Sequence, residues 1–162
     1  MRTTLIVNGV TAWQMLHRRA RVGPGQTILV HGANGGVGSI LVQLARHAGV
    51  RVTGTASPRH HLALRALAVK PLDYRAPDFA ADVRRLTPDG VRAAFNPLGL
   101  GSARRSFQLL AQGGTLAAYG MAEDLKSSRW MLGQFLALFS QMIVWNTLPD
   151  SRRAMVFPGR SP

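Results

Sequence analysis

The chain has 162 residues, enough for one domain, and 46% of them are hydrophobic, so a core can be buried. It contains no cysteine, which excludes disulfides, thiolate metal sites and cysteine nucleophiles. The net charge of +13 comes almost entirely from arginine and is compatible with a basic nucleic-acid-binding protein. The arginines are scattered, however, and form no long block, so we expect solvated helix faces and no nucleic-acid partner.

Short apolar segments alternate with amphipathic ones along most of the chain. In chain order we expect a helix over 10–21, a strand over 27–30, a helix over 37–48, a strand over 50–55, a helix over 60–68, a strand over 71–74, a helix over 79–86, a strand over 91–95, a helix over 103–110 and a strand over 115–119. This alternation predicts βαβ units in a parallel sheet. Because crossovers are right-handed, it favours an α/β, doubly wound Rossmann fold with a five-stranded parallel sheet in the order 3-2-1-4-5, lacking the last strand.

The two ends of the chain carry apolar segments of a different kind. The first twenty residues hold a short apolar run broken by Asn8 and Gln14, which argues against a signal peptide and favours a cytoplasmic protein. Residues 130–145 form an apolar helix that is shorter than the roughly 20 residues a membrane span needs. We therefore expect no membrane insertion but self-association through this helix. Its large apolar side chains should stay partly exposed: Trp130, Leu138, Phe139, Ile143 and Trp145, with Phe135.

A glycine-rich segment between the first strand and its helix is the most informative stretch. Gly32, Gly35 and Gly38 recur every third residue, a spacing that differs from GxGxxG but serves the same physics. Glycine permits tight turns and close approach of the backbone to a pyrophosphate, and the following helix offers free N–H groups to the phosphates. A plain glycine-rich turn is the alternative, but the strand before it and the helix after it favour dinucleotide binding.

The end of the second strand indicates which dinucleotide binds. NAD sites usually carry an acidic residue there for the ribose 2′-hydroxyl, and this sequence has none. Instead it offers Ser57, Arg59 and His60, which can bind a 2′-phosphate. The alternative is an exposed basic turn in an already basic protein. We expect NADP(H) rather than NAD(H).

Several segments together resemble the cofactor domain of zinc-independent quinone oxidoreductases, the zeta-crystallin-like branch of the medium-chain dehydrogenase/reductase superfamily. They are VTAWQMLHRRARVGPGQTILVHGANGGVGSILVQLARHAG, LDYRAPDF, GGTLAAYG and LPDSRRA, in that order. The resemblance implies hydride transfer from NADPH to a quinone or an activated alkene or carbonyl. It also implies a pyrophosphate site at Gly35, Gly36, Val37 and Gly38, beside Gly32, and a 2′-phosphate site at Ser57, Arg59 and His60. The family usually has a lysine at about position 60.

The resemblance extends to residues near the rest of the cofactor. Tyr74 matches a tyrosine near the adenosine phosphate, or is a core aromatic. Asn96 matches a position, often aspartate, beside the nicotinamide ribose, and Tyr119 and Gly120 end the fifth strand near that ribose. Thr11 would lie close to the nicotinamide, unless it is simply a hydroxyl at a helix amino terminus.

Zinc-dependent relatives have a cysteine ligand a few residues before this threonine, whereas residues 6–9 here offer no strong ligand. The five histidines show no metal-site spacing, so we expect no metal, and we name no catalytic residue.

By the same resemblance the chain divides into a helical lead-in at 1–22, the dinucleotide-binding domain at 23–122, and an apolar helix with a truncated tail at 123–162. Family members run about twice this length, and the substrate domain has no counterpart here. We therefore expect a fragment, a truncated frame or a degenerate paralogue whose isolated chain does not turn over quinone. The alternatives are a non-catalytic nucleotide-binding or scaffold protein derived from the family, and an unrelated basic nucleic-acid-binding protein.

Overall fold

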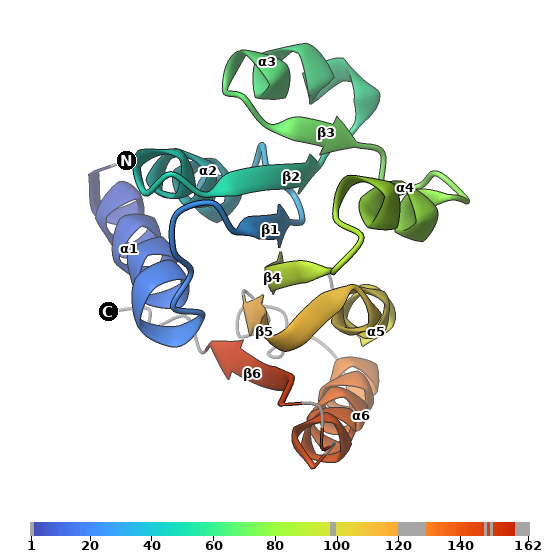
Figure 1. Cartoon of the computed structure of the whole chain (residues 1–162). Coiled ribbons are helices and arrows are strands. Elements are labelled where there is room, and N and C mark those ends of the chain that lie inside the picture. The colour runs from blue at the N-terminus through green and yellow to red at the C-terminus, as the bar shows by residue number, and fades with distance from the viewer. Residues whose placement is uncertain (1, 98–99, 120–128, 148, 150, 158–162) are drawn as a thin grey trace.

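The computed structural model describes residues 2–97, 100–119, 129–147, 149 and 151–157 (Figure 1). Its centre is a parallel sheet of six strands in the order β3-β2-β1-β4-β5-β6. The strands are β1 (Thr27–Val30), β2 (Arg51–Thr55), β3 (Lys70–Leu72), β4 (Val91–Asn96), β5 (Leu110–Tyr119) and β6 (Arg153–Phe157). The order of the first five strands confirms the sequence prediction. The expectation that the last strand is lacking was wrong.

Helices cover both faces of this sheet. They are α1 (Arg2–Trp13), the π-helical η1 (Gln14–Arg19), α2 (Gly36–His47), the 3₁₀-helical η2 (Pro58–His60), α3 (His61–Ala66), α4 (Phe79–Leu86), α5 (Leu100–Gln108) and α6 (Arg129–Asn146). Figure 1 shows α1 and α2 on one side of the sheet and α4, α5 and α6 on the other. The doubly wound architecture is therefore as expected.

Alternation along the strands divides the core into two layers. In β1, Ile28 and Val30 face α1 and α2, whereas Leu29 faces the α4, α5 and α6 side. In β4, Phe95 and Ala94 separate in the same way. Both layers are apolar because the sheet is covered on both faces, as buried parallel sheets require.

Two predicted boundaries shift in the structure. The first helix covers Arg2–Trp13 and then widens into η1, instead of spanning 10–21. Strand β5 begins at Leu110 rather than at 115, because Val91 pairs with Leu110 while Ala93 already pairs with Thr115. The extra residues form a bulge, in which Gly113 adopts a φ of 69° and its carbonyl accepts a 2.6 Å hydrogen bond from Arg92.

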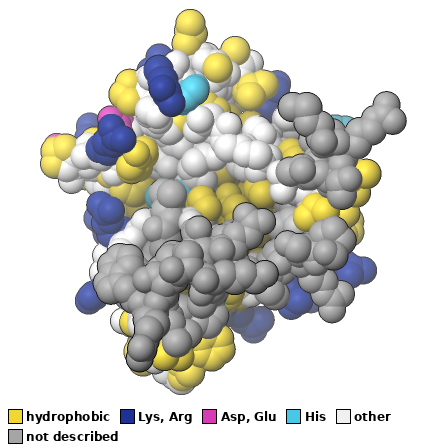
Figure 2. Space-filling view, turned by 180° about the vertical axis from the view of Figure 1, so that it is seen from behind, with side chains coloured by type: hydrophobic (Ala, Val, Ile, Leu, Met, Phe, Trp, Pro, Cys, Tyr) yellow, Lys and Arg dark blue, Asp and Glu magenta, His cyan; other side chains and the backbone are white. Residues whose placement is uncertain are grey.

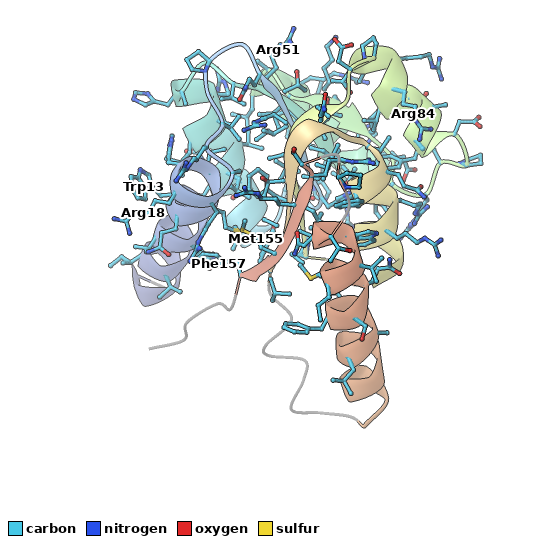
Figure 3. The ribbon with its side chains drawn as sticks, turned by 60° about the horizontal axis from the view of Figure 1, so that its bottom comes forward. Trp13, Arg18, Arg51, Arg84, Met155 and Phe157 are labelled. Atoms are coloured by element: carbon cyan, nitrogen blue, oxygen red, sulfur yellow. The ribbon has the colours of Figure 1, made fainter. Side chains whose placement is uncertain are left out.

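The sixth strand is held by its neighbours rather than by its own sequence pattern. Met155 and Phe157 pack against the layer that contains α1, and both side chains are labelled on β6 in Figure 3. The carboxamide of Asn146, at the end of α6, donates to the carbonyl of Ala154 at 2.9 Å and accepts from its N–H at 2.9 Å. The Asn146 side chain therefore pairs with the backbone of Ala154 as the backbone of a neighbouring strand would.

We predict that Asn146→Ala lowers the free energy of unfolding by about 1–2 kcal/mol, because two partly buried hydrogen bonds are lost together. Chemical denaturation monitored by circular dichroism measures this change. Ser140→Ala is the control, because the Ser140 hydroxyl bonds only the carbonyl of Leu136 within its own helix among the contacts described, on an exposed surface. Equal stability of the two variants would contradict the bracing role of Asn146.

Candidate functional site

The turn between β1 and α2 is built by glycines where side chains would not fit. Gly32 has a φ of 62°, and its carbonyl accepts a 2.8 Å hydrogen bond from the N–H of Gly35. A Cβ on Gly38 would overlap that same carbonyl oxygen, and a Cβ on Gly35 would lie only 3.2 Å from it. The first turn of α2 thus lies directly on the turn after β1, which leaves a narrow backbone cradle at the carboxyl edge of the sheet.

The amino end of α2 presents unpaired donors at this cradle. The first helical hydrogen bond runs from Ser39 N–H to the carbonyl of Gly35 at 2.8 Å. The N–H groups of Gly36, Val37 and Gly38 therefore have no backbone acceptor among the described residues. Together with the positive end of the helix dipole, these donors suit an anionic group such as a pyrophosphate.

The end of β2 is joined to this turn by two hydrogen bonds that Thr55 accepts. Its carbonyl accepts from the N–H of Ala33 at 3.0 Å, and its hydroxyl accepts from the N–H of Gly32 at 3.2 Å. Beyond it, Ser57 is half-buried and Arg59 is exposed. The Arg59 Nε donates to the Nε2 of His60 at 3.0 Å, so two of the three residues predicted for the 2′-phosphate are in contact.

The other predicted cofactor residues occupy different surroundings. Tyr74 is half-buried after β3 and belongs to neither core layer; its hydroxyl accepts from Arg75 Nε at 3.1 Å. This position does not favour the core-aromatic interpretation. Asn96 is buried at the end of β4, where its carboxamide contacts the Ser102 hydroxyl at 3.0 Å. Tyr119 is buried at the end of β5, and this burial raises the pKa of its hydroxyl above the ordinary range.

The last two predicted residues are Gly120 and Thr11. Gly120 falls outside the described residues. Thr11 is 8% exposed on α1, the helix that lies against α2, and stands inside this helix rather than at its amino terminus. The structure therefore brings the glycine turn, Thr55 and the Ser57 to His60 segment together at one edge of the sheet. No hydrogen bond or ring contact among the described residues joins these segments to Tyr74 or Tyr119, although Tyr119 shares a core layer with Ala33 of the turn.

A buried histidine that the sequence analysis did not single out lies beneath this site. His31 directly follows β1 and is 2% exposed. Its Nδ1 is 3.2 Å from the Thr55 hydroxyl, and its Nε2 is 2.7 Å from the Ser106 hydroxyl on α5. The sequence signal was a lone polar residue between an apolar strand and a glycine turn.

The hydrogen bonds around His31 run in one direction. Ser106 donates its proton to the Ser102 carbonyl at 2.8 Å, so its oxygen must accept from His31 Nε2–H. The opposite ring nitrogen then accepts from the Thr55 hydroxyl, whose oxygen accepts from Gly32 N–H. This relay places a proton on Nε2, and a neutral imidazole satisfies every contact in it.

The electrostatics of the site favour the same state. Burial, and secondarily the positive charge of Arg105, lower the pKa of His31 from 6.5 to about 4. Between these two values the unfolded chain binds a proton that the folded chain does not. The contribution of the neutral His31 to the free energy of unfolding is therefore fully present above pH 6.5 and is lost as the pH falls towards 4.

We predict that the free energy of unfolding of the wild type falls by about 3 kcal/mol more than that of His31→Gln between pH 7 and pH 4, since the glutamine does not titrate. Denaturant unfolding at a series of pH values measures the two slopes. His47→Gln, which removes an exposed histidine, should keep the wild-type slope. Parallel curves for wild type and His31→Gln would contradict this assignment.

Comparison with known proteins agrees with this geometry. Residues 36–146 match the family model of the zinc-binding dehydrogenases. The chain belongs to that family. Its place is in the medium-chain dehydrogenase/reductase superfamily, as the motifs of the sequence indicate.

Individual relatives cover most of this chain but only part of their own length. The human synaptic vesicle membrane protein VAT-1 homolog is 39% identical over 123 residues, which are 75% of this chain and 31% of the relative. The 2-haloacrylate reductase of a Burkholderia species is 36% identical over 124 residues, 75% of this chain and 37% of the relative. The chain thus spans about a third of the length of these relatives.

Solved structures give the same assignment. A domain described as an enoyl reductase of a polyketide synthase has a TM-score of 0.72 at 32% identity, covering 93% of this chain and 77% of that one. An NAD-dependent alcohol dehydrogenase also has a TM-score of 0.72, at 27% identity, covering 94% of this chain and 41% of that one. The family binds nicotinamide dinucleotides.

Two further findings concern the described residues alone. None of the helices there is both long and apolar enough to cross a membrane. No group of three histidine, cysteine or acidic residues that could hold a metal occurs within the same part of the chain.

In Figure 2, Lys and Arg side chains are spread around the visible face rather than gathered in one patch.

Proposed function

We propose that this chain is the NADP(H)-binding domain of a quinone oxidoreductase-like enzyme. The observation that carries the proposal is the cradle at Gly32–Gly38, with the free N–H groups of Gly36, Val37 and Gly38. It lies after β1, beside the point where the strand order reverses between β1 and β4. Ligands of open α/β sheets bind at this point because the loops on either side diverge and leave a crevice.

Different residues would bind different parts of the dinucleotide. Gly35, Gly36, Val37 and Gly38 would hold the pyrophosphate, because a close backbone with unpaired N–H groups suits its charge. Asn96, Tyr119 and Gly120 would border the nicotinamide ribose, with Thr11 near the ring and Tyr74 near the adenosine phosphate. When bound, the nicotinamide supplies hydride transfer, and the protein supplies orientation and shielding from water.

The choice of NADP(H) over NAD(H) depends on the end of β2. Ser57, Arg59 and His60 offer hydroxyl, guanidinium and imidazole groups, and no carboxylate follows the strand there to bind a free 2′-hydroxyl. Arg59 is exposed and contacts only His60 among the hydrogen bonds described, so its fork remains accessible to a phosphate.

The proposed reaction of the whole enzyme is hydride transfer to a quinone or to an activated alkene or carbonyl, in the cytoplasm and without zinc. Residues 6–9 lack a cysteine where zinc-dependent relatives carry a ligand, which supports the zinc-independent assignment. The substrate needs a closed cleft that holds the reacting atoms about 3–3.5 Å apart. We therefore expect the chain by itself to bind cofactor without turning over quinone.

Calorimetric titration of the purified chain with NADPH and NADH tests the proposal. We predict that Arg59→Ala weakens NADPH binding about tenfold to a hundredfold, because a hydrogen bond to a charged group contributes about 1.5–3 kcal/mol. Binding of NADH, which lacks the 2′-phosphate, should hardly change.

The matched control is Arg51→Ala. Arg51 is exposed at the opposite end of the same strand and is labelled in Figure 3. Its loss changes the net charge equally but leaves the cofactor edge intact. Equal losses for NADPH and NADH in Arg59→Ala would show that Arg59 does not bind the 2′-phosphate, and absence of binding by the wild type would overturn the proposed function.

Self-association through α6 is a second part of the proposal. The sequence expectation of exposure was wrong for Leu138 and Trp145, which are buried; Trp145 stacks on Phe107 at 4.5 Å. Trp130 and Phe135 have side chains outside the described set. Exposed residues remain in a stripe at helical spacing: Leu136, Phe139, Ile143 and Val144, each more than half exposed.

A second copy of the same helix is the occupant that suits this stripe. Arg129 is the only charged residue of α6, so the helix offers nothing to an acidic or basic partner. An uncharged, apolar stripe is complementary to itself about a two-fold axis. The net charge of +13 opposes association, so salt should strengthen it.

We predict that Ile143→Glu shifts the protein to monomer, because a charge is placed in the apolar stripe of each copy. Sedimentation velocity at several salt concentrations measures the change. Leu62→Glu is the control: Leu62 is 78% exposed on α3, at the other end of the sheet from α6 (Figure 1). A wild type that stays monomeric at high concentration and high salt would refute the self-association.

A further inference from the structure

Helix α1 reaches the amino end of α2 with a polar side chain. The amide nitrogen of Asn8 lies 2.9 Å from the point where a Cβ of Gly36 would stand. Gly36 is the first residue of α2. A side chain at this position would compete with Asn8 for the same space, so the glycine makes room for the carboxamide as well as for the turn.

Two polar side chains on this side of α1 have no hydrogen-bond partner among the described residues. The half-buried carboxamide of Asn8 makes no hydrogen bond to any described residue, and neither does the hydroxyl of Thr11, which is 8% exposed. Asn8 and Thr11 are three residues apart and so share one face of the helix. Among the described residues the one buried side-chain polar atom without a partner is Arg92 Nε, so water reaches the polar groups of both Asn8 and Thr11. A polar ligand can take the place of that water.

Donors without acceptors gather at this contact. The Asn8 amide nitrogen joins the N–H groups of Gly36, Val37 and Gly38, for which the described backbone supplies no acceptor. A carboxamide donor beside the positive end of a helix is favourable only when an acceptor, above all an anion, lies between them. The pyrophosphate assigned to this helix end is such an anion.

We propose that Asn8 is a cofactor-binding residue whose carboxamide donates a hydrogen bond to the pyrophosphate of the dinucleotide at the amino end of α2. The proposal rests on the proposed function of this site. It assigns part of the phosphate recognition to α1, which precedes the first strand of the sheet. It also explains why position 36 is glycine, although Gly36 has no positive φ.

The first test compares a ligand that contains the pyrophosphate with one that lacks it. Calorimetry with NADPH and nuclear magnetic resonance titration with 2′-AMP give the two affinities. Asn8→Ala should weaken NADPH binding about tenfold or more, as expected for a lost hydrogen bond to a charged group. Binding of 2′-AMP should be unchanged, because this fragment carries only the phosphate assigned to Ser57, Arg59 and His60.

A second variant separates a phosphate contact from simple packing. Asn8→Asp keeps the shape but replaces the donor with a negative charge. It should weaken NADPH binding more than Asn8→Ala does, and added salt should reduce the difference. The thermal stability of the cofactor-free protein should not fall, because a carboxylate near a helix amino end is favourable. Gln43→Ala, on the exposed surface of α2, is the control and should bind as the wild type does.

The outcomes distinguish the role of Asn8 from the proposed function on which it rests. If Asn8→Ala and the wild type bind NADPH equally while both bind 2′-AMP, the role of Asn8 is overturned and the proposed function stands. If Asn8→Ala loses 2′-AMP as well, the substitution acts through the fold, and the role of Asn8 is again overturned. If the wild type binds neither ligand, both proposals fail.

Discussion

The contact between the first turn of α2 and the turn after β1 determines the position of everything else at the site. Gly38 lies so close to the carbonyl of Gly32 that a single added methyl group would separate helix and strand. Because the two backbones touch, the amino end of α2 lies over the carboxyl edge of β1. The free N–H groups are thereby fixed in a direction that a flexible loop would not maintain.

The relay around His31 stabilises this contact from below. It connects the turn at Gly32 with the end of β2 through Thr55 and with α5 through Ser106. Ser102, which accepts from Ser106, also contacts Asn96 at the end of β4. The edge that would receive the dinucleotide is therefore braced by a buried polar network whose members each have a partner. Such networks keep an interior arrangement unique because any partial rearrangement leaves a buried group unpaired.

Strand β6, at the edge of the sheet, is held in place by contacts from other elements. Strand β6 is braced by Asn146 from α6 and by the packing of Met155 and Phe157 on the layer that includes α1. Segments from opposite ends of the chain thus complete the sheet together. The same two helices, α1 and α6, keep apolar side chains exposed, such as Trp13 and Ile143. Apolar area left in water contributes nothing to folding, which is why we propose a second copy as the partner of the α6 stripe.

The sequence by itself determined the first five strands, their order and the glycine cradle, because these depend on local periodicity, right-handed crossovers and the steric freedom of glycine. Tertiary structure decided the rest. Residues 153–157 carry charge at one end and proline just beyond the other, so only pairing with β5 and the Asn146 bracket make them a strand. The role of His31 likewise depends on Thr55 and Ser106, which lie 24 and 75 residues away in the chain. The meeting of Asn8 with Gly36 depends on how α1 crosses α2, an angle that side-chain packing sets and that no local pattern encodes.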